Sequence, residues 1–337
     1  MPADGPASSR RAFLAAAALL PLAGCGTAGR DTDRADRAAT SARPTAEPSR
    51  RTPAPPVRRP RLADLERAYG ARVGVYALAT GTGATAVHRA DERFAFCSVF
   101  KALAAAAVLH HRSPDGLDRR VTYTRADLKS TSPITGRHVA TGMTLRDLCA
   151  AAVRYSDGTA GNLLMRDLGG PARLTAYLRG LGDRVSRMDH YEPELHDVGP
   201  EDPSDTTTPR AVATDFRELL LGTALPAGER ALLTDWLSHN ATAVGARRIR
   251  AGLPKGWQVA DKTGTGNWGR ANDIAVVRPP RTAPLVLAVM TDRPGYDTEP
   301  SDALIAEATA RTVTALAIQR APGLRPHRDS PWPITGP

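Results

Sequence analysis

Alternating hydrophobic and polar positions predict β-strands near both ends of the chain. Residues 73–77 alternate as expected of a strand with one buried face. Three more strand-like runs follow late in the chain, at residues 257–260, 274–277 and 285–290. Pro279-Pro280 lies between the last two runs and predicts a turn. We therefore expect neighbouring antiparallel strands in the last third of the chain.

Helical periodicity predicts most of the remaining structure. Apolar residues recur at helical spacing from Leu304 to Leu316, behind a Ser301-Asp302 helix start, which predicts a C-terminal helix with one apolar face. The middle of the chain, from Ser98 to about Leu237, has a mostly helical pattern. Strands at both ends around a helical middle predict an α+β fold in which the two ends share one sheet.

The first 25 residues are better explained as an export signal than as structure. Ser9-Arg10-Arg11 with the residues that follow resembles a twin-arginine signal, and its apolar stretch is shorter than the roughly 20 residues of a spanning helix. Leu22-Ala23-Gly24-Cys25 resembles a lipobox with Cys25 as the lipidated N-terminus. The alternative is an ordinary leader with an incidental cysteine. We expect a protein that is lipid-anchored on the outer face of the cell membrane or secreted.

Composition divides the rest of the chain into a tether, one domain and a tail. Residues 26–60 are mostly Thr, Ala, Arg and Pro, a composition that cannot bury a core. The proline-rich residues 322–337 have an equally irregular pattern. One folded domain is therefore predicted over residues 61–321.

The net charge of +10, from 45 basic and 35 acidic residues, raises the question of a nucleic-acid partner. Residues 1–60 hold ten arginines against five acidic residues, so half of this charge lies outside the predicted domain. The chain carries no zinc-finger, basic-zipper or RNA-binding signature. We interpret the rest as a solvated, arginine-rich surface and expect no nucleic-acid partner.

Cysteines and histidines predict neither a metal site nor a cofactor. Cys97 and Cys149 are the cysteines of the predicted domain, and an exported protein could join them in a disulfide. Both lie beside apolar helical stretches, which favours buried free thiols. The histidines lack metal-ligand spacing such as H-E-x-x-H.

Candidate chemistry begins at Ser98, which opens an apolar helix and is followed by Lys101 one turn later. A serine hydroxyl needs a base to become a nucleophile. Lysine can serve when burial removes its proton, which arginine cannot do. Taken alone, an S-x-x-K pair is explained better by a helix cap and a surface charge.

Two further motifs weaken that alternative. Tyr155-Ser156-Asp157-Gly158 supplies an S-D-x, and Asp261-Lys262-Thr263-Gly264-Thr265-Gly266 supplies a K-T-G after the strand run that ends at Ala260. Only four of the 45 basic residues are lysines, and two of these, Lys101 and Lys262, fall in the motifs. S-x-x-K, S-D-x and K-T-G in this order are close to the signature set of class A β-lactamases and penicillin-binding proteins.

Over residues 61–321 the chain resembles a class A serine β-lactamase of the actinomycete type. The resemblance extends to an omega-loop segment, the stretch after it and the strand after K-T-G, which are residues 192–195, 205–209 and 271–275. It implies an all-α subdomain beside an α/β subdomain whose mainly antiparallel sheet is covered by the terminal helices. We expect a monomer whose partner is a small-molecule β-lactam.

The resemblance implies catalytic roles for five residues. Ser98 would attack the lactam carbonyl, and the backbone amides of Ser98 and Thr265 would form the oxyanion hole. The acylation base would be Lys101, or Glu192 acting through a water, while Glu192 would be the deacylation base. Ser156 would relay a proton to the leaving nitrogen, helped by Lys262.

It also implies a substrate-binding set, which comprises Thr263, Gly264, Thr265, Arg248, Asn162 and Gly158. Thr263, Thr265 and Arg248 would bind the substrate carboxylate, and Asn162 would steady the omega loop. Two alternatives stay open: Arg248 lies among other arginines and could be a surface charge, and Asn162 could be a helix-surface amide.

Four residues depart from the family pattern. Gly158 replaces the asparagine of S-D-N and removes an amide that would bind the substrate's acylamino side chain. His196 replaces the asparagine that usually holds the hydrolytic water, although an imidazole can still donate or accept a hydrogen bond. His190 replaces an omega-loop arginine and would remove a salt bridge. Thr131 replaces an aromatic residue at the cleft entrance.

Three functions use these motifs. A β-lactamase acylates and then hydrolyses, a D-alanyl-D-alanine carboxypeptidase or transpeptidase lacks the omega-loop glutamate, and a lactam sensor stays acylated and is normally joined to a spanning helix. Glu192 therefore favours hydrolysis of penicillins and cephalosporins, with resistance as the result.

Overall fold

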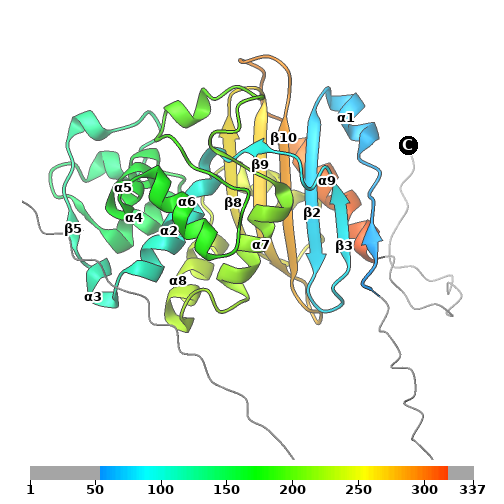
Figure 1. Cartoon of the computed structure of the whole chain (residues 1–337), viewed down its shortest axis with the longest axis horizontal. Helices are drawn as coiled ribbons and strands as arrows, with labels where there is room; N and C mark the ends of the chain where they lie inside the picture. The colour runs from blue at the N-terminus through cyan, green and yellow to red at the C-terminus, as the bar shows by residue number, and fades with distance from the viewer. Residues whose placement is uncertain (1–53, 318–337) are drawn as a thin grey trace, which may run out of the picture. The chain divides into compact units, whose positions relative to one another are not determined.

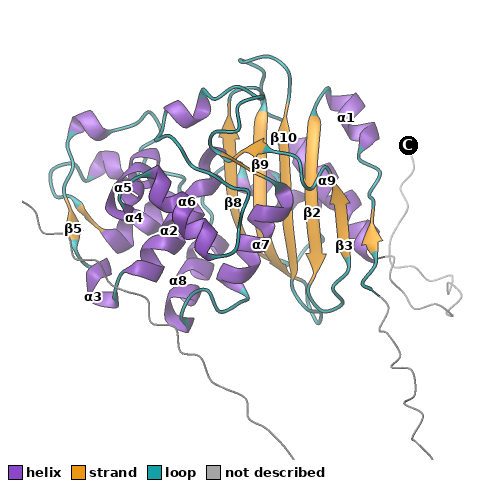
Figure 2. Cartoon of the chain, viewed as in Figure 1, coloured by secondary structure: helices purple, strands orange, loops and turns teal. Residues whose placement is uncertain are grey.

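The computed structural model describes residues 54–317, which form an α+β fold, as predicted. A six-stranded sheet in the order β1-β3-β2-β10-β9-β8 forms one layer, and neighbouring strands are antiparallel except β1 and β3 (Figures 1 and 2). The strands of this sheet are β1 (Val57–Arg58), β2 (Arg72–Ala79), β3 (Thr85–His88), β8 (Gln258–Gly266), β9 (Arg270–Arg278) and β10 (Leu285–Asp292). Two short ladders pair β4 (Phe94–Ala95) with β7 (Thr206–Thr207) and β5 (Arg120–Val121) with β6 (Met143–Thr144).

Both faces of the sheet are buried, because successive residues of a strand point to opposite sides. On β10, Val286, Ala288 and Met290 belong to the core shared with the helices of the middle segment. Leu287 and Val289, one residue out of step, belong to a second core on the other face. A strand buried on both faces has no polar alternation, which explains why residues 285–290 form a continuous apolar run.

Helices cover these two faces. Helix α9 (Asp302–Ala317) contacts the sheet within the second core, and α7 (Pro209–Leu220) contacts β2, β9 and β10 within the first (Figure 1). The other helices are α1 (Ala63–Tyr69), α2 (Phe100–His111), α3 (Pro114–Leu117), α4 (Leu145–Arg154), α5 (Gly158–Leu168), α6 (Pro171–Gly180) and α8 (Ala227–Ser238). Single 3-10 turns are η1 (Cys97–Val99), η2 (Arg125–Asp127), η3 (Thr135–Arg137), η4 (Glu194–His196), η5 (Gly245–Arg247) and η6 (Ile249–Gly252).

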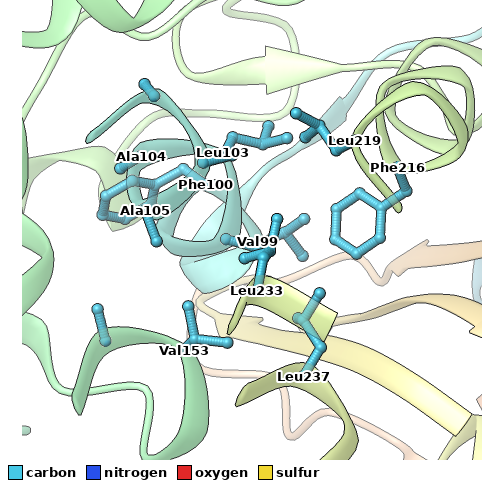
Figure 3. Packing of buried hydrophobic residues seen from close by; sticks show 14 of the residues in the cluster. Val99, Phe100, Leu103, Ala104, Ala105, Val153, Phe216, Leu219, Leu233 and Leu237 are labelled. Atoms are coloured by element: carbon cyan, nitrogen blue, oxygen red, sulfur yellow. The ribbon is translucent and has the colours of Figure 1, made fainter. Parts of the chain in front are cut away.

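Helix α2 lies at the centre of the helical layer. Every residue from Phe100 to Leu109 is buried, as expected of a helix that is apolar on all sides. Its side chains pack among residues of α4, α7 and α8, with Leu103 toward Leu219, and Val99 of the preceding turn η1 lies toward Leu233 (Figure 3). This packing holds the start of α2, which carries the S-x-x-K motif, in one place relative to the sheet.

Most elements agree with the sequence prediction, but some boundaries differ. Strand β8 continues through the K-T-G motif to Gly266 instead of ending at Ala260, because it pairs with β9 along its whole length. The tether predicted over residues 26–60 is too long, because Val57 and Arg58 already pair with β3. Cys97 and Cys149 are buried free thiols, as predicted.

The predicted signal of residues 1–25, with Cys25, and the predicted tail of residues 322–337 lie outside the described residues. Among residues 54–317, no helix is long and apolar enough to cross a membrane.

Candidate active site

A cleft of about 640 Å³ lies between strand β8 and the helical layer. Residues from all three sequence motifs line it, together with the loops before α4 and after α8 and with His196 of the omega loop: Ser98, Lys129, Ser130, Thr131, Ser132, Tyr155, Ser156, His196, Thr242, Thr263, Gly264 and Thr265. A larger groove of about 830 Å³ at the far end of α2, beside His110 and His111, contains none of the motif residues. The fold therefore brings the motifs together at one place.

Ser98 lies in turn η1, and helix α2 begins at Phe100 instead of at Ser98 as predicted. The backbone on both sides of the cleft is strained, since Cys97 (φ 45°) and Ser156 (φ 57°) occupy the left-handed region. Such conformations cost about 1–3 kcal/mol each and persist where the surrounding structure enforces them. In this site one strained residue directly precedes Ser98, and the other is Ser156 itself.

The side chain of Lys101 contacts three oxygen atoms. Its Nζ lies 2.9 Å from Ser98 Oγ, 2.7 Å from the Ser156 carbonyl oxygen and 2.8 Å from Glu192 Oε1. Lys101 and Glu192 are only 1% and 4% exposed, so each charge has the other as its buried partner. A Cβ at Gly161 on α5 would come within 3.0 Å of Lys101 Cε, so this glycine leaves room for the lysine.

Glu192 is held as a carboxylate by the positive groups around it. Burial alone would raise its pKa, but Lys101 and His196 lower the pKa of Glu192 to about 2. His196 Nε2 lies 3.5 Å from Glu192 Oε1. Burial lowers the pKa of His196, but the neighbouring Cys97 thiol and Glu192 outweigh burial and raise that pKa to about 9. Glu192 is therefore ionised at neutral pH, and the raised pKa of His196 favours the imidazolium form beside it.

Asn162 fixes the backbone of Glu192. Its Nδ2 donates to the Glu192 carbonyl oxygen at 2.8 Å, and its Oδ1 accepts from the Glu192 amide at 3.0 Å. Asn162 is buried, so the alternative of a helix-surface amide is wrong.

Lys262 extends from β8 to the serine of the S-D-x motif. Its Nζ donates to Ser156 Oγ at 3.0 Å and to the Thr263 carbonyl oxygen at 2.7 Å. Burial, and then the charge of Lys101, lower the pKa of Lys262 to about 7. Lys262 is therefore able to gain or lose a proton near neutral pH.

Arg248 is fully buried, so its interpretation as a surface charge is wrong. Its Nη1 donates to the carbonyl oxygens of Gly264 and Asn272, and its Nε donates to Asp302 Oδ1 at 2.7 Å. Its Nη2 donates to Thr265 Oγ1 at 2.8 Å. The guanidinium therefore reaches the cleft through the Thr265 hydroxyl.

The structure changes the interpretation of two of the four departures from the family pattern, those at His190 and Gly158. His190 Nδ1 lies 2.6 Å from Asp205 Oδ2, so the omega-loop salt bridge is kept with a histidine in place of the arginine. A Cβ at Gly158 would overlap Glu192 Oε2 and come within 2.9 Å of Thr131 Oγ1. Gly158 therefore makes space for the Glu192 carboxylate, in addition to lacking an amide.

Sequence reasoning missed three residues of the site. Asp157 is buried, caps α5 and accepts hydrogen bonds from the backbone of Ile134 and Thr135. Its position in the S-D-x motif could have identified it from the sequence as a residue of the site. The other two are Thr242, whose Oγ1 lies 3.4 Å from Thr263 Oγ1, and Asp302, the partner of Arg248. Nothing in the sequence around them indicates a role in this site.

Comparison with known proteins agrees with this geometry. A sequence model of the Beta-lactamase enzyme family matches residues 58–316. The chain is 53% identical to a β-lactamase of Mycobacterium tuberculosis, over 91% of this chain and 97% of that protein. It is 54% identical to a β-lactamase of Amycolatopsis lactamdurans, over 79% of this chain and 87% of that protein. The solved structure of a class A β-lactamase from Mycobacterium abscessus superposes with a TM-score of 0.73 at 46% identity, covering 76% of this chain and 98% of that chain.

Proposed function

The chain belongs to the class A β-lactamase family and hydrolyses β-lactams, and we propose that it does so through an acyl-enzyme on Ser98. The observation that carries this mechanism is the convergence of a hydroxyl, an amine and a buried carboxylate. Ser98 Oγ lies 2.9 Å from Lys101 Nζ and 3.4 Å from Glu192 Oε1. The proposed substrates are penicillins and cephalosporins.

Acylation requires a group that takes the Ser98 proton as Oγ attacks the lactam carbonyl. A neutral Lys101 amine would donate its two hydrogens to Ser156 O and Glu192 and would turn its lone pair toward Ser98. The alternative base is Glu192, which would take the proton through a water, because its 3.4 Å separation from Oγ is long for direct transfer. The backbone amides of Ser98 and Thr265 are the proposed oxyanion donors.

Ring opening requires a proton on the departing lactam nitrogen. Ser156 would supply it, and Lys262, 3.0 Å from Ser156 Oγ, would restore it. The substrate carboxylate would bind Thr263 and Thr265, with the Arg248 charge behind the Thr265 hydroxyl.

Deacylation requires a water that attacks the Ser98 ester. Glu192 would remove one proton from this water, and Ser98 Oγ would regain a proton as the ester bond breaks. The ionised, buried Glu192 favours this hydrolytic route over a carboxypeptidase or a sensor, both of which would lack this base.

The setting of the enzyme is also part of the proposal. The cleft and the contacts around it already bring together all the proposed catalytic and binding residues without a second copy, and the proposed form is a monomer. The twin-arginine and lipobox patterns support export in the folded state and a lipid anchor on Cys25, with secretion as the outcome where Cys25 is not lipidated.

The decisive test of the mechanism is Ser98→Ala. We expect the intact-mass adduct with a penicillin to disappear while the thermal unfolding temperature stays the same, because the change removes one oxygen atom. Ser130→Ala, which deletes an exposed hydroxyl at the same cleft, should keep the adduct and serves as the control. An adduct that persists in Ser98→Ala would overturn the assignment.

A further inference from the structure

The omega segment, which we define as residues 192–205, contains no helix or strand after turn η4. It carries Glu192, which is assigned here to the deacylating water, and His196, whose Nε2 lies 3.5 Å from Glu192 Oε1. A segment without regular structure depends on contacts with other elements for its position. The position of Glu192 and His196 therefore depends on the side chains that contact the rest of the segment.

Three side chains hold three consecutive residues of the omega segment. Asn267 Nδ2 donates to the His196 carbonyl oxygen and to Asp197 Oδ1, both at 3.1 Å. Tyr296 Oη donates to the same Asp197 oxygen at 2.5 Å. Beside them, Arg270 Nη2 donates to the Val198 carbonyl oxygen at 2.7 Å. We call Asn267, Arg270 and Tyr296 the latch.

The latch residues lie on the β8–β9 hairpin and on the loop between β10 and α9, which are hydrogen-bonded to each other. Asn267 and Arg270 flank the turn between β8 and β9, and Tyr296 lies between β10 and α9. The Trp268 amide donates to the Tyr296 carbonyl oxygen at 2.8 Å, and the two rings meet edge to face at 4.8 Å. The Arg270 guanidinium lies 4.5 Å from the centre of the Trp268 ring. These contacts hold the two parts of the latch against each other, so that the latch residues have fixed positions beside the omega segment.

We propose that the latch is a set of positioning residues that keeps His196 and Glu192 aligned with the acyl-enzyme during deacylation. This rests on the proposed function, in which Glu192 delivers the deacylating water. The latch hydrogen bonds go to residues 196–198 of the omega segment, whereas Ser98, Lys101, Ser156 and Lys262 lie on other elements. Acylation has Lys101 as a second candidate base, whereas deacylation depends on Glu192 alone, so weakening the latch slows deacylation more than acylation.

The test compares Tyr296→Phe with Tyr69→Phe. Each variant deletes one exposed hydroxyl that donates to a carboxylate, Asp197 in the first case and Glu307 on α9 in the second. We expect Tyr296→Phe to slow deacylation about three- to tenfold, the scale of one lost hydrogen bond, and to raise the acyl-enzyme fraction at steady state. Its acylation rate should change less than about twofold, and Tyr69→Phe should match the unmodified protein in both steps.

A second pair of variants separates positioning from general destabilisation. Asp197→Asn keeps an oxygen that accepts from Tyr296 and Asn267 and should retain most of the deacylation rate. Asp197→Ala removes the acceptor of both side chains and should slow deacylation at least as much as Tyr296→Phe. Equal slowing of acylation and deacylation, or no change in Tyr296→Phe and Asp197→Ala, would overturn the proposal.

Hydrogen exchange of residues 194–205 supplies a readout that does not depend on the assigned catalytic roles. Exchange should quicken in Tyr296→Phe and Asp197→Ala and stay unchanged in Tyr69→Phe. Unchanged exchange in all variants would show that the latch does not hold the segment. If exchange quickens while Glu192→Ala turns over normally, the role of Glu192 is at fault, and the latch has no catalytic consequence.

Discussion

His190 Nδ1 lies 2.6 Å from Asp205 Oδ2, which joins the chain just before the omega segment to the last residue of that segment. Asp205 is fully buried and also accepts hydrogen bonds from the backbone amides of Asp189 and His190. A titratable imidazole thus occupies a place where an arginine would be charged at every pH. The stability of this pair should therefore depend on pH.

The first prediction concerns this pH dependence. The hydrogen bond with Asp205 raises the pKa of His190 in the folded protein. The pair therefore contributes its full stabilisation below the pKa of about 6.5 that histidine has in the unfolded chain. This stabilisation is lost as the pH rises through the higher pKa of the folded protein. His190→Gln should lower the free energy of unfolding by up to about 1 kcal/mol at pH 5.5, since His190 is partly exposed. The difference should shrink at pH 9, as urea unfolding at both pH values would measure. His190→Arg should remove the dependence, and a loss that grows with pH would contradict the assignment.

The second prediction concerns Glu192. Removing the base should slow deacylation by about 10²–10⁴-fold and leave acylation less affected, so the acyl-enzyme should accumulate. Intact mass of Glu192→Ala after mixing with a penicillin measures this directly. Glu192→Gln is needed beside it, because alanine also leaves the buried Lys101 without its partner. Glu194→Ala, which changes an exposed acid two residues later, should turn over normally. A rapid turnover by Glu192→Gln would argue against this base.

The third prediction concerns His196. Its imidazolium lowers the pKa of Glu192 and makes the carboxylate a weaker base, so His196→Asn should deacylate as fast as the unmodified protein or up to about tenfold faster. The advantage should fade above pH 9, where His196 loses its charge. Rates of single-turnover deacylation from pH 6 to pH 10 would check this. A variant that stalls as an adduct would mean that the imidazole itself takes part in hydrolysis.

The fourth prediction concerns export. Changing both Arg10 and Arg11 to lysine should leave the protein in the cytoplasm, because a twin-arginine signal is read by its arginine pair. Fractionation followed by immunoblotting would measure the distribution. Changing Arg50 and Arg51 to lysine, a second arginine pair in the predicted tether, is the matched control and should not affect export. Export of the first variant at the normal level would contradict a twin-arginine route.

Much of the fold and part of the site were predictable because their signals are local. Strand alternation at 73–77 and the helical spacing after Ser301 depend on neighbouring residues, and β2 and α9 confirm them. The same holds for Ser98 and Lys101, which one helical turn brings to 2.9 Å. The scarcity of lysine in an arginine-rich chain also distinguishes Lys101 and Lys262 as candidate chemical groups.

Only the tertiary structure decided which distant residues meet. Nothing near Arg248 distinguishes it from Arg247 or Arg250, yet packing buries it against Asp302, 54 positions later. The space that Gly158 leaves for Glu192 and the contact of Tyr296 with Asp197 are also unpredictable from local pattern. The physical reason is that propensity and periodicity act over a few residues. The burial of a charge, the room beside a glycine and a bond between loops depend on how separate elements pack.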